Sequence, residues 1–322
     1  MYYCNIAKDV STWDTVALQW KQHFYQKLKV HLPVEEFRKV NKINQKVHKV
    51  FGRKISNSEE WVNRKNPEQP ITCVVPFYNA ENYIDKTIRS IASQDYDNYN
   101  VILINDASTD NSVDVVNKTI YSYSDKIRAK FTMLSNDVNQ GAVYNQYHAF
   151  KLVPENNITM IIDGDDWLAY DNTIFDYYNN LYHDGAEFTY GSCWSLADNI
   201  PLVAQPYPSS VKAQKSYREH MFNWGMPYPH LRTFKASLAS TLSAEQCQDE
   251  DGNWYRAGGD NAIFYALIES ADPDKVIAVQ DINYIYNDLN PLNDYKVNPV
   301  EQNATATKIR SLPSEKKILV KT

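Results

Sequence analysis

The spacing of four apolar runs constrains the fold of this 322-residue chain more than any other feature. These strand-like runs lie about 30 residues apart, as βα units require, at Ile71–Val75, Val101–Ile104, Phe131–Leu134 and Met160–Ile162. Helix-like stretches lie between them, at Glu81–Ser93, Ser112–Tyr121 and Gly141–Leu152. The alternation predicts the α/β class, with a mostly parallel sheet sandwiched by helices.

A polar cluster follows each of the four apolar runs. The clusters read "PFYNA" at 76–80, "NDASTD" at 105–110, "NDVNQG" at 136–141 and "DGDD" at 163–166. In open α/β sheets, ligands bind outside the carboxyl ends of the strands. Because all four clusters fall at such ends, the sequence predicts a binding site along that edge of the sheet.

The "DGDD" cluster concentrates negative charge, with Asp163, Asp165 and Asp166 directly after an apolar strand. Two carboxylates about 5 Å apart repel by roughly 3 kcal/mol at an effective dielectric of about 20. Either water screens them fully or a cation belongs there. Mg²⁺ and Mn²⁺ prefer oxygen ligands, often one or two carboxylates completed by phosphates and water. A D-x-D pattern alone is a weak signal, but three neighbouring polar clusters strengthen it.

Several function classes lack their motifs. The sequence contains neither GxxxxGK[ST] nor a GxGxxG after a strand, which argues against a P-loop NTPase and a Rossmann dehydrogenase. A nucleotide can instead be held through a metal that bridges its phosphates. The net charge of −6 provides no overall basic footprint for nucleic acid, so we expect no nucleic-acid partner.

The four cysteines are far apart and form no metal-type pair, which favours a reducing compartment. No apolar run approaches the roughly 20 residues of a membrane span, and the first 30 residues lack a signal-peptide pattern. We therefore expect a cytoplasmic protein, with peripheral membrane contact as the alternative considered next.

Residues 1–70 predict a helical N-terminal extension that ends in the linker-like segment "NRKNPEQP". Its second helix, within residues 34–54, has an apolar stripe and a face rich in lysine and arginine. A solvated face is the simpler interpretation; a docking surface for an anionic membrane or a partner is the other. The predicted domains are 1–70, a main domain at 71–295 and a C-terminal tail at 296–322.

The opening of the main domain resembles glycosyltransferase family 2. The segment "ITCVVPFYNAENYIDKTIRSIASQDYDNYNVILINDASTDNS" has the family's apolar strand, P-x-Y-N, S-I-x-x-Q and [DN]-D-x-S-x-D elements. "NQGAVYNQYHAF" is similar to its N-x-G element and "DGDDWL" to its D-x-D-D motif. "HLRTFK", "GGDNAIF" and "YIYNDLNPLND" resemble bacterial and viral members. The resemblance covers roughly 70–290 and implies a GT-A fold, which is Rossmann-like, and an inverting enzyme that uses a nucleotide sugar.

The resemblance also implies roles for residues of the donor site. Asp106 matches the carboxylate that accepts from the nucleobase, usually uracil, and Pro76 and Tyr78 line the same pocket. Asp163 matches the ribose-facing or metal-binding member of D-x-D, and Asp165 the metal ligand that touches the diphosphate. The implied cofactors are Mn²⁺ or Mg²⁺, with a UDP-sugar as donor. Turn formation is the alternative role for Asp106.

Asp260 in "GGDNAIF" matches the catalytic base of the family, which would deprotonate an acceptor hydroxyl of a glycan, protein or lipid. An N-cap for the helix Asn261–Glu269 is the alternative, and the two roles are compatible. The sequence departs from the family at Gly259, where glutamate is common, and it has no Q-x-x-R-W motif.

Non-catalytic nucleotide-sugar binding within a larger assembly is the alternative function.

Three further residues keep open assignments. Arg232 could contact the diphosphate or an acceptor carboxylate through its planar fork, or form a structural ion pair. His230 is predicted to be a packed or hydrogen-bonded histidine, and no histidine follows Asp260 to serve as a late metal ligand. Asp166 is expected either to orient its loop or to cap the helix that follows.

Overall fold

The computed structural model describes residues 66–313, apart from residue 170 and residues 221–229. The predicted N-terminal extension and its basic face at 34–54 lie outside the described residues. All the elements described below belong to the unit Lys54–Thr322.

The predicted βα alternation is confirmed by the first four strands. Strands β1 (Ile71–Phe77), β2 (Tyr99–Asn105), β3 (Phe131–Ser135) and β4 (Ile158–Ile161) pair in the order β3-β2-β1-β4, and every pairing is parallel. Strands β1 and β4, which have neighbours on both sides in the full sheet, are buried along their whole length. Strand β3 lies at the edge and is half-exposed. Apolar runs without alternation are typical of strands covered on both faces.

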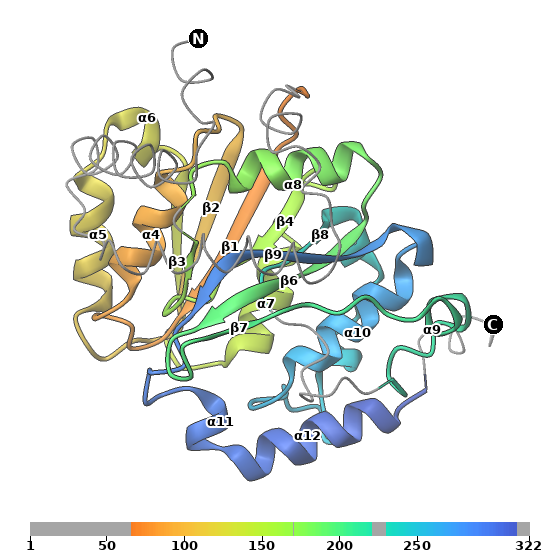
Figure 1. Ribbon diagram of the computed structural model, residues 1–322. Coiled ribbons are helices and arrows are strands. Elements are labelled where there is room, and N and C mark those ends of the chain that lie inside the picture. Colours follow the sequence, from red (N-terminus) through yellow and green to blue (C-terminus); the bar gives the residue numbers. More distant parts are fainter. Residues whose placement is uncertain (1–65, 170, 221–229, 314–322) are drawn as a thin grey trace. The chain divides into compact units, whose positions relative to one another are not determined.

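Three helices connect these strands, as predicted. They are α4 (Ile84–Ala92), α5 (Ser112–Tyr121) and α7 (Ala142–Phe150). Because βαβ crossovers are right-handed, α4 and α5 cover one face of the sheet, where they pack against each other (Figure 1). The connection through α7 runs back across the sheet and therefore places this helix on the opposite face, where it contacts α10 (Asp260–Ser270).

The second half of the sheet is mixed. Strand β8 (Arg232–Lys235) pairs antiparallel to both β4 and β6 (Phe188–Ser195), and β9 (Val276–Tyr286) runs parallel to β6. Two short strands, β5 (Trp167–Leu168) and β7 (Ile200–Leu202), pair antiparallel to β9 and β6. Helix α8 (Ile174–His183) and the short α6 (Asp125–Arg128) and α9 (Ser209–Gln214) complete the layers with three short 3-10 turns, Ala236–Thr241, Glu245–Cys247 and Pro273–Lys275.

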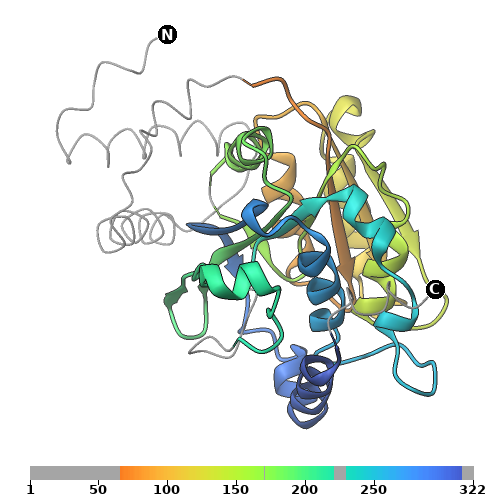
Figure 2. The same ribbon diagram turned by 90° about the vertical axis from the view of Figure 1, so that its right-hand side faces the viewer.

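Two C-terminal helices, α11 (Asp294–Val297) and α12 (Pro299–Ser311), follow the last strand. Figures 1 and 2 show α12 beneath α10, with which it is in contact. The contact is reinforced by Arg218, whose guanidinium donates to both carboxylate oxygens of Glu269 on α10 and to the carbonyl of Ile309 on α12. Residues 299–311 of the predicted tail are therefore packed against the main domain.

Within the described part of the chain, none of the helices combines the length and the apolar character that a membrane span requires.

Candidate active site

A cavity of about 630 Å³ lies at the carboxyl edge of the parallel strands. Its walls come from the ends of β1, β2 and β4, from the start of α7, and from the segments that flank α10 and α12. The predicted clustering of polar residues at one sheet edge is thus seen in the structure. All nine residues singled out from the sequence line this one cavity: Pro76, Tyr78, Asp106, Asp163, Asp165, Asp166, His230, Arg232 and Asp260.

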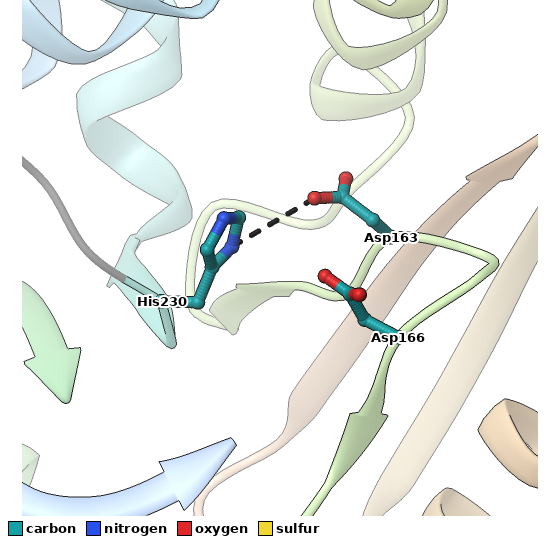
Figure 3. Close-up of side chains that lie close together, drawn as sticks. All are labelled: Asp163, Asp166 and His230. Carbon is teal, nitrogen blue, oxygen red and sulfur yellow. Dashed lines mark ion pairs between the residues drawn. The ribbon is translucent and has the colours of Figure 1, made fainter. Parts of the chain in front are cut away.

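The strongest acidic centre in the cavity joins two aspartates of "DGDD" to a histidine. Asp163, Asp166 and His230 each offer one ligand atom, and these atoms all lie within 4.8 Å of one another (Figure 3). His230 Nδ1 lies 3.7 Å from Asp163 Oδ2. The His230 ring is stacked on Tyr284 at 4.8 Å and on Tyr286 at 5.3 Å between centroids. These rings hold the imidazole facing the two carboxylates.

Burial disfavours the charged forms of both the carboxyl and the imidazole groups in this cluster. Burial, followed by the charges of Asp165 and Asp163, raises the pKa of the Asp166 carboxyl well above its ordinary value. Burial, followed by the positive charge of Arg232, lowers the pKa of His230 well below its ordinary value. The imidazole is consequently neutral, so it cannot offset the aspartates, but neutral imidazole is the form that binds metals.

The cluster passes a simple test of fit for a divalent cation. The Asp166 carboxylate is buried, and its partners are the amide of Asn287 and the hydroxyl of Tyr284. A carboxylate offers about four acceptor positions, so a cation or a proton can occupy one that remains. Two carboxylates and one neutral imidazole are a donor set that a divalent transition metal such as Mn²⁺ accepts, whereas Mg²⁺ favours oxygen donors alone.

Packing determines the path of the "DGDD" loop. A Cβ on Gly164 would lie 2.3 Å from Phe77 Cβ, so only glycine allows the loop to pass this close to β1. Its amide donates to the carbonyl of Pro76 at 3.0 Å. The Thr87 hydroxyl of α4 bonds the carbonyls of Gly164 and Asp166 at 3.0 and 2.6 Å. The loop is therefore held from both the first strand and the first helix.

Asp165 lies beside the cluster rather than in it. Its Oδ2 accepts a hydrogen bond from Asn290 Nδ2 at 2.6 Å, and burial raises the pKa of the Asp165 carboxyl. Asn287 donates hydrogen bonds to both Asp165 and Asp166. Its side chain donates to the Asp165 carbonyl at 3.1 Å, and its backbone amide donates to Asp166 Oδ1 at 2.7 Å. The bond from Asn287 ties Asp166 to the segment after β9, and the role of Asp166 in orienting its loop stays a prediction. The metal role of Asp165 stays a prediction.

Asp260 and Arg232 form an ion pair in the same cavity. Arg232 Nη2 lies 3.1 Å from Asp260 Oδ2, and the guanidinium stands 4.5 Å from the centroid of the Phe264 ring. Asp260 is the first residue of α10, and the residue before it, Gly259, occupies the N-cap position. The Asp260 Oδ1 atom accepts from the amide of Asn261 at 2.9 Å. Arg232 thus forms an ion pair, and its contact with a diphosphate or an acceptor carboxylate stays a prediction.

Asp106 connects the end of β2 to the 136–141 loop. Its Oδ1 accepts from Asn136 Nδ2 and from the amide of Gln140, and its Oδ2 accepts from the amide of Gly141, each at 2.8 Å. A carboxylate offers about four acceptor positions, so one position on Oδ2 remains. Pro76 and the partly exposed Tyr78 lie on the same wall.

Sequence reasoning missed two contributions to this site. His230 was expected to be a packed histidine, yet it faces the acidic cluster as well as being packed. Tyr284, whose hydroxyl accepts from the amide of Asp163 at 3.0 Å, was not singled out. His230 lies in the motif "HLRTFK" and Tyr284 in "YIYNDLNPLND", both of which resemble family members. Their place in these motifs was the signal from which a role in the site could have been predicted.

Comparison with known proteins places the chain in a family. The family described as Glycosyl transferase family 2 matches residues 72–242, more than half of the chain. A teichoic acid poly(glycerol phosphate) polymerase of Staphylococcus epidermidis is 35% identical over 99 residues, 31% of this chain and 13% of that protein. The putative colanic acid biosynthesis glycosyl transferase WcaA of Escherichia coli K12 is 29% identical over 187 residues, 56% of this chain and 63% of that protein.

Among solved structures, S. aureus TarS 1–349 in complex with UDP-GlcNAc superimposes with a TM-score of 0.49 at 16% identity, covering 68% of this chain and 58% of that chain. The chain thus spans less than two thirds of the length of each of these three proteins. The predicted α/β architecture, with parallel strands between helices, is confirmed by the strand pairing. On the family match and this fold, the chain belongs to glycosyltransferase family 2.

Proposed function

We propose that this chain is a metal-dependent inverting glycosyltransferase that transfers a sugar from a nucleotide sugar to an acceptor hydroxyl of a glycan, protein or lipid. UDP is the nucleotide we expect. One observation carries the proposal: the acidic cluster and the Asp260–Arg232 pair line one cavity. A cation site and a base in one space are what sugar transfer from a diphosphate requires.

Asp163, Asp166 and His230 would hold the cation, with Asp165 as a further carboxylate within the same loop. Bound there, a divalent cation supplies Lewis-acid neutralisation of the charge that develops on a diphosphate leaving group. The chain's own contribution is to keep these donors in place. Stacking on Tyr284 and Tyr286 orients the imidazole, and the bonds from Asn287 orient the Asp166 loop.

Asp260 would take the proton of the acceptor hydroxyl as general base. Arg232 pairs with Oδ2 of the Asp260 carboxylate, and the backbone amide and side-chain amide of Asn261 both donate to Oδ1. One acceptor position on Oδ2 remains for an incoming hydroxyl. A single displacement at the anomeric carbon inverts that centre. The leaving diphosphate needs no protonation, so the two-carboxylate arrangement of glycoside hydrolases is not required.

On the strand-end side, Asp106, Pro76 and Tyr78 would bind the nucleotide. The remaining acceptor position of Asp106 suits an imide N–H of the kind that uracil presents. Pro76 and Tyr78 offer apolar surface for the planar base. Because the amide groups of Gln140 and Gly141 hold Asp106, the pocket is pre-organised by the backbone of the 136–141 loop.

The experiment is to offer the full chain a panel of nucleotide sugars with Mn²⁺ and to measure the nucleotide released. We expect turnover of a UDP-sugar, its loss on adding a chelator, and its recovery with added Mn²⁺. Asp114→Asn is the matched control, because Asp114 is an exposed aspartate of α5 outside the cavity. Tight binding of UDP without turnover of any donor would overturn the proposal and leave a nucleotide-sugar-binding module.

A further inference from the structure

A second cavity, of about 670 Å³, lies next to the active-site cavity. It is bounded by the segment 249–256, by Gln140 and by one face of α12. Arg256 and Glu301 line both cavities, so the two spaces meet at these side chains. Its volume falls in the roughly 300–1,000 Å³ range of ligand sites. Nothing in the proposed chemistry uses this space.

The lining of the second cavity combines aromatic surface with neutral polar groups. Trp254 is partly exposed, and its other side packs on Tyr147 and Tyr144 of α7 at 5.1 and 5.3 Å between centroids. Amide side chains of Gln140 and Asn253 line the same space. A fixed aromatic plane surrounded by amide donors and acceptors matches a sugar ring, which has an apolar C–H face and a rim of hydroxyls.

Charges in this cavity do not favour an anionic polymer. Two acids, Asp249 and Glu301, accompany two bases, Arg256 and Lys308. Arg256 is engaged by Asn139 through Nη1 at 2.9 Å and Nη2 at 3.1 Å, and Lys308 pairs with Glu250. Among the described residues, Glu301 has neither an ion pair nor a hydrogen bond to its carboxylate. It is therefore available to accept from hydroxyls at the junction of the two cavities.

The backbone connects this cavity directly to the proposed base. The segment from Trp254 to Asp260 begins at the second cavity and ends in the first, and six residues span at most roughly 20 Å. Gly258, within that segment, passes so close to α12 that a Cβ would lie 2.6 Å from the carbonyl oxygen of Gln302. The packing of α12 against this segment thus forms the junction between the two spaces.

We infer that the second cavity is an acceptor subsite for a neutral oligosaccharide. It binds a sugar unit preceding the one whose hydroxyl reaches Asp260, with Trp254 under the ring and Glu301 accepting from its hydroxyls. The inference rests on the proposed function, because Asp260 as general base defines where the reacting sugar of the acceptor glycan lies. It narrows the acceptor from glycan, protein or lipid to a glycan of at least two units.

The test has a binding arm and a kinetic arm. Labelled full-length protein, with UDP and Mn²⁺ present, is applied to an array of neutral mono- to hexasaccharides of varied linkage. We expect binding that rises between one and three units and changes little with added salt. For the series that binds, kcat/KM is then measured with the mono- and trisaccharide. Trp254→Ala removes one aromatic stack, so it should lower the ratio of kcat/KM for the trisaccharide to kcat/KM for the monosaccharide about tenfold.

Further variants keep the test independent of folding. Glu301→Gln removes only a charge from an exposed side chain and should lower the same ratio about fivefold. Trp254→Phe should restore part of it. Tyr121→Ala is the matched control: it removes an exposed ring from the end of α5, at the opposite edge of the sheet, and the ratio should not change.

The outcomes separate this inference from the proposed function. The subsite is overturned if one and three units bind equally. It is also overturned if the chain-length preference survives in both Trp254→Ala and Glu301→Gln. Donor turnover with any of those results leaves the transferase proposal intact. Conversely, length-dependent binding that needs Trp254, in a protein that turns over no donor, supports a glycan site and overturns the transferase proposal.

Discussion

The two walls of the active-site cavity are built by different means. The strand-end wall, formed by residues 76–80, 106, 139–146 and 163–166, follows directly from four parallel strands and is held by backbone hydrogen bonds. The helical wall, formed by 256–260 and 292–302, belongs to no strand end. It is held by side chains, chiefly the Arg218–Glu269 pair and the packing of α10 on α12. The stability and activity of the protein should therefore respond differently to mutations in the strand-end wall and in the helical wall.

The largest expected effect is on the helical wall, in Asp260→Asn. Removing a general base should lower kcat about 10²- to 10⁴-fold, because the acceptor hydroxyl then lacks a proton acceptor. UDP binding, which we assign to the strand-end wall, should stay the same. Steady-state kinetics and UDP titration by calorimetry measure the two quantities. A wild-type kcat in this variant would refute the role of Asp260 as base.

The second prediction concerns what holds the helical wall in place. Glu269→Ala leaves the buried Arg218 without its carboxylate, which should cost about 3–5 kcal/mol of unfolding free energy. Chemical denaturation measures it. The matched control is Asp97→Ala, which breaks the exposed pair with Lys126 and should produce no resolvable change. If the two variants proved equally stable, side-chain pairing would not be what holds this wall.

On the strand-end wall, Gly164→Ala should cost about 1–3 kcal/mol, since the added Cβ meets Phe77 and the loop has to move. The same change should weaken Mn²⁺ binding, because Asp163 directly precedes the displaced residue and Asp166 lies two residues after it. Gly185→Ala is not a suitable control, as Gly185 has a positive φ of 100°. Ser93→Ala, at the end of α4, is a better reference for local stability. A fully stable Gly164→Ala with normal Mn²⁺ affinity would contradict the packing argument.

The smallest expected effect tests the support behind the acidic cluster. Tyr284→Phe retains the ring that stacks on His230 but removes the hydroxyl that accepts from the Asp163 amide. Loss of such an outer contact should weaken Mn²⁺ binding about 10- to 100-fold. Tyr286→Phe also retains its stack and serves as the control, with little change expected. Electron paramagnetic resonance of free Mn²⁺ reports the affinity. Equal affinities in both variants would remove Tyr284 from the metal site.

The strand-end wall was predictable to a useful degree. Apolar runs 30 residues apart, as βα units place them, indicated four strands, and all four formed within a few residues of the expected bounds. The polar clusters after them met at one edge because parallel strands share the direction of their carboxyl ends. Local periodicity and a topological rule were sufficient, since neither depends on contacts between distant side chains.

The helical wall was less predictable. Asp260 and Arg232 were singled out through resemblance, but their pairing depends on β8 lying antiparallel to β4, which no local pattern encodes. The same pairing brings His230, at the entry to β8, to the end of β4, where Asp163 and Asp166 lie. Residues 299–311 were expected to be tail, yet they pack beneath α10 because Arg218 and the close approach at Gly258 join distant segments.

Sequence alone thus determined the βα frame, the edge that carries the site and the acidic loop, because these arise from periodicity and from residue types at strand ends. Tertiary structure alone decided which of the three aspartates face a histidine, that Arg232 orients Asp260, and that a second cavity adjoins the first. The physical reason is range: these features depend on side chains brought together by strand pairing and helix packing, over separations of many tens of residues.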